Sequence, residues 1–168
     1  MNLNNYIKDI VDFPKKWIIF KDISPLLSSP EAFEYCIDSL AKNISDADVI
    51  VWLDARWFIF GWALAYKLKK PFVPVRKSGK LPDETISIQY DLEYGSNTFE
   101  IHKNAISKWQ KVVVIDDLLA TGWTAQAACE LIEKLWWEIL SVEFVIELEF
   151  LEWKNKLSKY NVNSLLKY

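Results

Sequence analysis

The chain has 168 residues, a formal net charge of −3 and a pI of about 5.3. A chain of this length can bury a full core without disulfides or metal, so residues 1–168 are predicted to form one domain. The weakly acidic balance gives no support to a nucleic-acid-binding surface. The N-terminus lacks the layout of a signal peptide, and no apolar run approaches the ~20 residues of a membrane span. We therefore expect a cytoplasmic protein that binds neither nucleic acid nor membrane.

The first third of the chain carries signals for two helices. Apolar residues recur at helical spacing over 3–11, which predicts a short amphipathic helix that ends before Pro14. A short extended piece is expected at 18–20. Ser29 then has the features of an N-cap, with Pro30 at the first helical position of a second helix. Cys36, in that helix, and Cys129, farther along the chain, have no metal-ligand spacing and are expected to be small core residues in a reducing compartment.

The next part of the chain alternates short apolar strands with a helix. Strands are predicted at 49–53 and 72–75, and Pro74 marks an end or an irregular position of the second. Between them, residues 58–68 form a nearly all-apolar helix that should lie in the core. This alternation favours an α/β fold with a parallel sheet.

Residues 76–100 are polar and are interrupted by Gly79, Pro82 and Gly95. Alternation of apolar residues in this segment is weak. A long excursion of this kind in a compact domain is usually functional, so residues 77–97 are predicted to form a lid.

The stretch at 111–125, KVVVIDDLLATGWTA, is expected to organise the rest of the domain. Its β-branched run at 112–115 predicts a strand buried on both faces. Asp116 and Asp117 follow the run, then a loop at 118–122 and a helix at 124–135. Ligands of open parallel sheets sit at the carboxyl ends of the strands, where a helix N-terminus suits an anion. The stretch therefore indicates a site for a phosphate on a polyol.

The C-terminal part adds a strand and a helix. Residues 139–148 should form a strand whose alternating glutamates indicate an end that emerges toward solvent. A polar helix over about 152–160 and a short tail at 164–168 complete the chain.

The stretch at 111–125 resembles the phosphoribosyl-pyrophosphate (PRPP) motif of type I phosphoribosyltransferases. An isolated pair of acids would more often be two solvated carboxylates, but this motif is long and specific. The resemblance implies that Asp116 and Asp117 accept hydrogen bonds from the ribose 2′- and 3′-hydroxyls. It further implies that a loop wraps the 5′-phosphate, formed by Ala120, Thr121, Gly122, Trp123 and Thr124.

Three other pieces, DARWFIFGWALA, VRKSGKLP and LEYGSNTFEIHKNAI, resemble the adenine phosphoribosyltransferase branch of this family in order and spacing. The resemblance implies a type I phosphoribosyltransferase fold, with a central, mostly parallel, twisted sheet flanked by helices, a flexible lid loop and a small hood. It implies that adenine and PRPP are converted to AMP and pyrophosphate, with Mg²⁺ bound mainly through PRPP and no direct protein ligand. It also suggests a homodimer.

The same resemblance assigns the remaining candidate residues. Pyrophosphate would be met by Arg56 and Lys80, and the catalytic residues that close over the site would be Glu93 and Tyr94. Adenine would be contacted by the backbone of Ile19 and by Lys21, where many members carry arginine; lysine lacks the planar bidentate geometry.

Tryptophan stands where the family carries glycine, or where a turn calls for it, at positions 17, 52, 57, 109, 123, 136, 137 and 153, and less clearly at Trp62. At residue 123 the backbone should approach the phosphate closely. The chain has only 4 glycines and 9 tryptophans, whereas average usage of roughly 7% would give about 12 glycines. Two alternatives follow. The chain is a catalytically impaired PRPP-binding relative, or its gene comes from an organism that reads UGA as glycine and the codon is written here as tryptophan.

Overall fold

A computed structural model of the chain describes residues 1–54, 58–91, 95–105 and 107–168. Its central feature is a seven-stranded sheet in the order β5-β6-β4-β3-β7-β8-β9. The neighbouring strands β4, β3, β7, β8 and β9 pair in parallel. Strands β5 and β6 form an antiparallel hairpin, and β6 pairs antiparallel with β4, so the hairpin extends the sheet beyond β4. The strands are β3 (Val49–Leu53), β4 (Phe72–Lys77), β5 (Thr85–Asp91), β6 (Ser96–His102), β7 (Lys111–Leu119), β8 (Glu138–Glu147) and β9 (Val162–Lys167).

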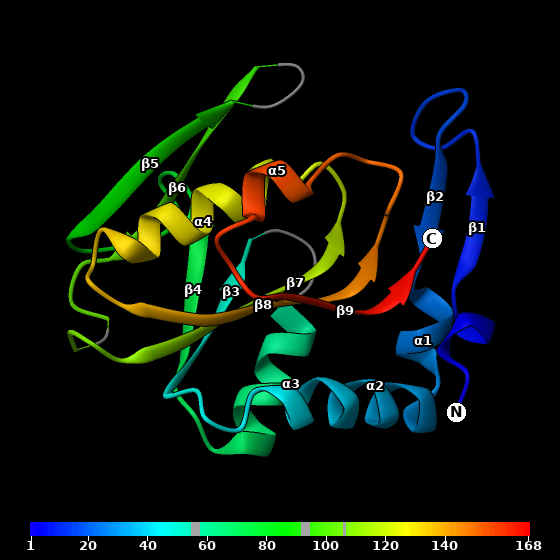
Figure 1. The fold of residues 1–168 in the computed structure, drawn as a ribbon, viewed down its shortest axis with the longest axis horizontal. Coiled ribbons are helices and arrows are strands. Elements are labelled where there is room, and N and C mark those ends of the chain that lie inside the picture. The colour runs from blue at the N-terminus through cyan, green and yellow to red at the C-terminus, as the bar shows by residue number, and fades with distance from the viewer. Residues whose placement is uncertain (55–57, 92–94, 106) are drawn as a thin grey trace.

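Helices cover both faces of this sheet (Figure 1). On one face lie α4 (Trp123–Glu133) and α5 (Lys154–Leu157), and on the other α2 (Pro30–Asn43) and α3 (Phe58–Leu68). The core is divided accordingly. Val112 and Val114 of β7 pack in the cluster under α4, whereas Val113 and Ile115 pack in the cluster under α2 and α3. The apolar run of β7 is continuous because both of its faces are buried.

The central predictions are confirmed. The sheet is mostly parallel and flanked by helices, and the strand at 49–53 and the helix at 58–68 have the predicted bounds. Helix α2 begins at Pro30, and the Ser29 hydroxyl accepts a hydrogen bond from the Ala32 N–H at 3.3 Å. Cys36 and Cys129 are buried and free. Within the described ranges, no helix combines the length and apolar character needed to span a membrane.

The N-terminal helix prediction is wrong. Only Leu3–Tyr6 is helical, as a 3₁₀ turn (η1), and β1 (Lys8–Val11) pairs antiparallel with β2 (Ile19–Asp22). The helical periodicity of residues 3–11 is overridden because β1 gains cross-strand hydrogen bonds to β2. This two-stranded sheet stands beside the C-terminus, apart from the central sheet, and α1 (Ser24–Ser28) connects it to α2 (Figure 1).

Residues 76–100 are more regular than predicted. Most of the segment belongs to the β5–β6 hairpin, and β6 pairs with β4 through Arg76 and Lys77. The weak apolar alternation at Ile86 and Ile88 is that of an edge strand with one face against the core. Pro74, predicted at an irregular position, lies inside β4 opposite Trp52.

Two further expectations are corrected near the surface. Helix α3 is only half buried, because Ile59, Trp62 and Tyr66 are exposed. Strand β8 does not emerge toward solvent, since the tail forms strand β9 beside it and buries Glu143 and Glu147. The Asn163 amide donates to Glu143 at 2.9 Å, and the Ser164 hydroxyl and Lys167 ammonium contact Glu147. The predicted polar helix is limited to Lys154–Leu157.

Candidate active site

Two cavities and a small pocket meet at the carboxyl ends of β3 and β7. The first cavity, of about 400 Å³, is lined in part by the N-terminal two-stranded sheet and has five aspartates or lysines in its lining. It is lined by Phe13, Phe20, Lys21, Asp22, Ile23, Trp52, Leu53, Asp54, Asp116, Asp117, Leu118 and Ile146. Polar groups at strand ends beside an apolar wall give this cavity the character of a ligand site.

Asp116 and Asp117 lie inside the second half of β7, because the strand continues to Leu119 rather than ending before the acids. The N–H of Asp117 donates to Oδ1 of Asp116 at 3.0 Å. Burial, and next the charge of Asp117, raise the pKa of Asp116 well above its usual range. Asp116 lines both the first cavity and the small pocket, so it stands where their contents would meet.

The small pocket, of about 70 Å³, lies over the N-terminus of α4. It is lined by Asp116, Leu118, Leu119, Ala120, Thr121, Gly122, Thr124, Ala125 and Phe144. Gly122 is the N-cap, with φ of 82°, and no side chain caps the helix. The first N–H groups of α4 are therefore left without a capping side chain, and Thr121 and Thr124 add hydroxyls. The pocket has the size and donors for one phosphate group.

A second, more apolar cavity of about 470 Å³ adjoins the same loop. Its lining comprises Ile18, Ile19, Phe20, Lys21, Leu118, Ala120, Thr121, Trp123, Leu148 and Leu151. Ile19 and Lys21, both predicted to contact adenine, are thus brought together. Lys21 also lines the first cavity, so it marks the junction of the two.

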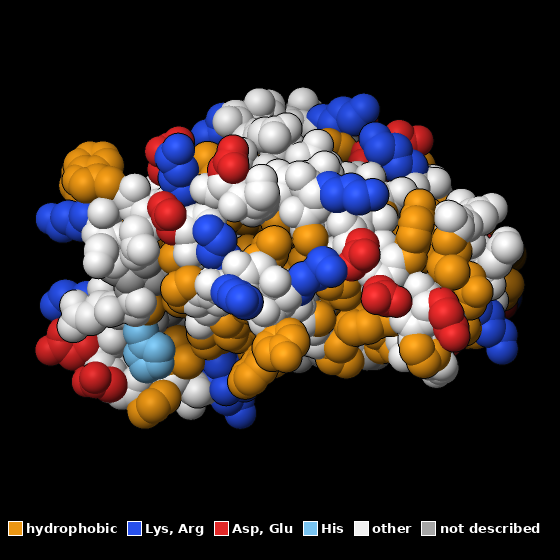
Figure 2. Space-filling model, turned by 90° about the horizontal axis from the view of Figure 1, so that it is seen from below, with side chains coloured by type: hydrophobic (Ala, Val, Ile, Leu, Met, Phe, Trp, Pro, Cys, Tyr) orange, Lys and Arg blue, Asp and Glu red, His pale blue; other side chains and the backbone are white. Residues whose placement is uncertain are grey.

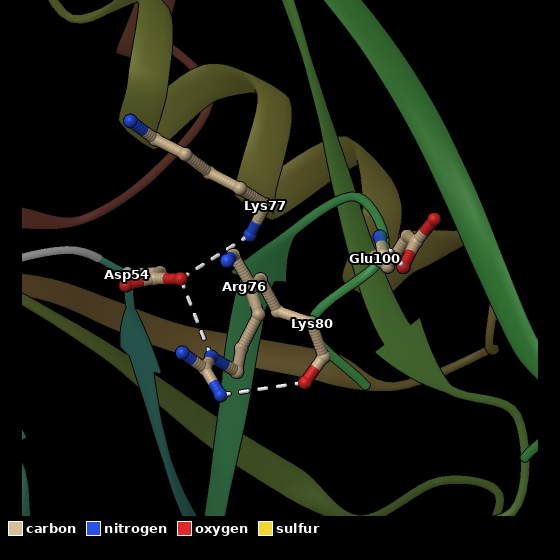
Figure 3. A network of polar contacts seen from close by, with 6 residues as sticks. Asp54, Arg76, Lys77, Lys80 and Glu100 are labelled. Atoms are coloured by element: carbon tan, nitrogen blue, oxygen red, sulfur yellow. Dashed lines mark hydrogen bonds and ion pairs between the residues drawn. The ribbon is translucent and has the colours of Figure 1, made fainter. Parts of the chain in front are cut away.

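Asp54 at the end of β3 organises a polar network (Figure 3). Its Oδ2 accepts from Arg76 Nε at 3.3 Å and from the Lys77 N–H at 3.4 Å, and Arg76 Nη1 donates to the Lys80 carbonyl at 3.4 Å. Neither Asp54 nor Arg76 is among the predicted site residues. The signal was present in the strand-end position of Asp54, but the pair is 22 residues apart and depends on the β3–β4 pairing.

The other predicted residues are placed less completely. Lys80 is exposed and lines neither cavity nor the pocket, although its backbone is held by Arg76. Arg56, Glu93 and Tyr94 lie outside the described residues.

Residue 123 differs from expectation in its backbone. Trp123 is the first residue of α4 and does not have a positive φ, so the left-handed torsion of this loop belongs to Gly122. Trp123 therefore departs from the family pattern through the size of its side chain, and its backbone torsion does not require glycine. The ring lines the apolar cavity, and Lys156 Nζ lies 4.3 Å from its centroid.

Tyr90 is a neighbour of the site that is not among the predicted site residues. It stacks on Phe99, with ring centroids 4.7 Å apart, and its hydroxyl lies near Asn97 and near Thr124 of α4, which lines the small pocket. Burial raises the pKa of this hydroxyl, and Asp116 contributes to the rise. The hairpin is thereby connected to the N-terminus of α4.

Paired acids in the second half of β7, a helix start without a side-chain cap and an adjoining apolar cavity are the parts that an α/β domain needs to transfer a phosphoribosyl group. Residues 27–149 match the family described as "Phosphoribosyl transferase domain", and the chain belongs to that family. It is 49% identical to the adenine phosphoribosyltransferase of Pseudothermotoga lettingae over 100% of both chains, and 51% identical to that of Clostridium novyi over 100% of this chain and 99% of the relative.

Solved structures agree. The adenine phosphoribosyltransferase of Thermoanaerobacter pseudethanolicus matches with a TM-score of 0.94 and 49% identity, over 99% of this chain and 98% of that chain. The Saccharomyces cerevisiae enzyme, solved with an imino-altritol bisphosphate and adenine, matches with a TM-score of 0.91 and 41% identity, over 95% and 94%. The predicted type I phosphoribosyltransferase fold is confirmed.

Proposed function

We propose that this protein is an adenine phosphoribosyltransferase, which joins adenine to the C1′ carbon of PRPP and releases AMP and pyrophosphate. The observation that carries the proposal is the continuity of three spaces. A phosphate-sized pocket at the start of α4, a cavity with paired acids and an apolar cavity for a flat base share lining residues, among them Leu118. Full-length relatives that bear the enzyme's name support the same conclusion and give no support to a silent relative.

The residues would act mainly by positioning and charge. Backbone N–H groups at the start of α4, with Thr121 and Thr124, hold the 5′-phosphate. Asp116 and Asp117 accept hydrogen bonds from the ribose hydroxyls, which fixes the sugar beside the base. As pyrophosphate leaves, positive charge grows on the sugar and negative charge on the diphosphate. The nearby carboxylates stabilise the positive charge on the sugar. Arg56 and Lys80 are proposed to neutralise the negative charge on the diphosphate.

Glu93 and Tyr94 are proposed to close over the reacting atoms with the lid, and the backbone of Ile19 and the side chain of Lys21 to contact adenine. Exclusion of water by closure strengthens each electrostatic contact within the site. Ile19 lines the apolar cavity, which suits the faces of a purine.

Mg²⁺ is the proposed cofactor, held mainly by the diphosphate oxygens. The site chemistry fits, because the first cavity is lined by Asp54, Asp116 and Asp117, and Mg²⁺ prefers oxygen ligands. Across the described residues no set of three metal-binding side chains forms a protein cage. The ion would neutralise negative charge on the leaving group. Chelation with EDTA should therefore abolish AMP formation.

The test is synthesis of AMP from labelled adenine, PRPP and Mg²⁺, with hypoxanthine and guanine as competing bases. Asp117→Asn should weaken PRPP binding at least about tenfold, since a hydrogen bond to a charged group contributes roughly 1.5–3 kcal/mol. Asp46→Asn makes the same change at an exposed acid and should bind PRPP normally. Equal PRPP affinity of Asp117→Asn and Asp46→Asn would contradict the site assignment.

We further propose a cytoplasmic homodimer. The free thiols of Cys36 and Cys129 suit a reducing compartment. The face formed by α2 and α3 shows hydrophobic side chains gathered among charged ones (Figure 2), and α3 exposes 44% of Ile59 and 88% of Tyr66. Ile59→Asp should shift the protein toward monomer in light scattering. Phe150→Asp, which changes an exposed apolar residue outside α3, should not; a monomeric wild type would contradict the proposal.

A further inference from the structure

Lys21 is held by two residues that neither the family resemblance nor the comparisons assign to the site. Its Nζ donates to both carboxylate oxygens of Asp9, at 2.8 and 3.0 Å, across the β1–β2 register. The same Nζ lies 3.8 Å from the ring centroid of Tyr168, the last residue of the chain. The Lys21 side chain is only 12% exposed, although it lines both cavities.

Tyr168 is itself fixed. Its N–H donates to the Glu147 carbonyl at 2.9 Å, and its carbonyl accepts from the Glu149 N–H at 2.8 Å. The ring is therefore presented to Lys21 from the end of the central sheet, while Asp9 reaches it from the separate two-stranded sheet. A lysine has a flexible stem and one charged head, and an aromatic face with a carboxylate restricts that head to one place.

We propose that Asp9 and Tyr168 are positioning residues that fix Lys21 at the junction of the base cavity and the ribose cavity. This inference depends on the proposed function through the role of Lys21. It predicts that loss of the ring raises the KM for adenine while the KM for PRPP is unchanged, because the proposed PRPP contacts are made by residues other than Lys21.

The test compares Tyr168→Leu with Tyr168→Phe. Leucine removes the aromatic face, whereas phenylalanine keeps it and removes only the hydroxyl. Tyr168→Leu should raise the adenine KM about fivefold, and Tyr168→Phe should behave as the wild type. Equal kinetics for Tyr168→Leu and wild type, or equal damage in both variants, would overturn the proposal.

A second readout does not need activity. The rate at which acetic anhydride modifies Lys21, measured by mass spectrometry against the exposed Lys108, should rise severalfold in Tyr168→Leu and in Asp9→Asn but not in Tyr168→Phe. A Lys21 rate that is unchanged in the first two variants would refute the positioning. A wild type that forms no AMP but protects Lys21 in this way would count against the proposed function alone.

A different observation concerns the tryptophans. Among the described residues, six non-glycine residues have positive φ, and three of them are tryptophan: Trp17 at 73°, Trp109 at 67° and Trp136 at 64°. Three of the four glycines, Gly79, Gly95 and Gly122, share this conformation. A positive φ is uncommon for any side chain and is an outlier for a bulky one, whereas glycine adopts it readily.

These three side chains are largely exposed and, within the described structure, make ring contacts only: the Trp109 and Trp136 ring centroids are 6.4 Å apart, and Lys16 Nζ lies 5.1 Å from the Trp17 ring centroid. Trp17, Trp109 and Trp136 are 86%, 73% and 61% exposed, and each lies in a turn. Their backbones carry the hydrogen bonds: the Trp17 N–H donates to Asp12 at 2.7 Å, the Trp109 N–H to the Trp136 carbonyl at 3.1 Å, and the Trp136 N–H to the Glu133 carbonyl at 2.9 Å after α4. Trp136 thus has the left-handed conformation that commonly ends a helix with glycine.

Trp153 gives an independent indication that tryptophan does not suit its position. Its indole N–H is buried and has no hydrogen-bond partner in the described structure, whereas a buried indole usually finds one.

We infer that residues 17, 109, 136 and 153 are glycine in the native polypeptide, encoded by UGA, which different genetic codes read as stop, tryptophan or glycine. The shortage of glycine beside the excess of tryptophan has the same explanation. The same codon at residue 123 would place glycine beside the phosphate pocket and remove the indole from the base cavity.

The coding DNA decides the matter: UGA at these four positions is expected, and UGG would overturn the inference. A physical test uses Trp109→Gly and Trp136→Gly, with Tyr66→Gly as the control at an exposed aromatic residue inside α3. Relief of a left-handed side chain should raise Tm by about 2–8 °C in each of the first two, whereas the control should lower it. A fall in all three variants would overturn the backbone argument.

Discussion

Strands β7 and β5 lie in one sheet but differ in how deeply their side chains are buried and in how many strands flank them. In β7, Val112 to Ile115 are fully buried on both faces, and the strand has neighbours on both sides. Strand β5 lies at the sheet edge, and its apolar residues Ile86 and Ile88 are only half buried. The paired acids are thus built on the most buried strand. The hairpin that carries the proposed lid is built on an edge, where movement disturbs less packing.

The largest expected effect comes from matched isoleucine changes in the two strands. Ile115→Ala leaves a cavity in the fully buried core and should lower the free energy of unfolding by about 2–5 kcal/mol. Ile88→Ala should cost less than half as much, because its side chain already meets solvent. Urea denaturation measures both. Equal losses would show that the hairpin is as tightly packed as the centre of the sheet.

Asp116 should give β7 a pH dependence between pH 4 and pH 8. Because burial and Asp117 raise its pKa in the folded state, the ionised form destabilises the fold. That penalty is absent below the unfolded pKa of about 3.9 and is complete once the pH exceeds the folded pKa. Asp116→Asn cannot ionise, so its Tm should exceed that of the wild type at pH 8, and the difference should vanish toward pH 4.

Asp46→Asn is the control for this pH series, since that acid is exposed. A Tm difference for Asp116→Asn that stays constant from pH 4 to 8 would contradict the burial argument. The same variant should bind PRPP more weakly, because the amide replaces one carboxylate acceptor with a donor. Stability and binding should therefore change in opposite directions.

The comparison also indicates which features the sequence could predict. Strand β3, helix α2 and the β7–α4 unit follow from continuous apolar runs and a local N-cap, so neighbouring residues sufficed. Strands β1, β5 and β9 depend on distant partners. Each is short or half exposed, and residues 3–11 even carry the periodicity of a helix.

The site divides in the same way. Asp116, Asp117 and the loop at 120–124 are consecutive in the chain, and the structure gathers them around the small pocket and the adjoining cavities. Asp54 with Arg76, and Tyr90 with Thr124, join separate elements, and no local pattern marks such pairs. The Trp123 torsion was wrongly anticipated because the helix begins one residue earlier than predicted.

The proposed lid at 77–97 should respond to ligands although the parallel strands do not. Addition of PRPP and adenine together is expected to slow proteolytic cleavage between β5 and β6 severalfold, as closure buries that segment. Adenine alone should have little effect, since the phosphate contacts at α4 would be missing. Cleavage at one rate under all conditions would contradict lid closure and leave the β7 assignments intact.

The smallest expected effect belongs to the ion pair at the base of the hairpin. Lys103 Nζ lies 3.1 Å from Glu84 Oε2, and the two side chains are 57% and 68% exposed. Exposed pairs gain little because water and salt screen their attraction and because both side chains lose rotamer freedom. A double-mutant cycle of Lys103→Ala and Glu84→Ala should yield a coupling of about 0.2–1 kcal/mol that decreases in 1 M salt. The Lys103–Glu84 pair joins residues next to the Thr85 and His102 register, so a larger, salt-independent coupling would mean that this pair fixes the hairpin on the sheet. In that case the edge would be as constrained as the centre, and closure would have to occur at the hairpin tip alone.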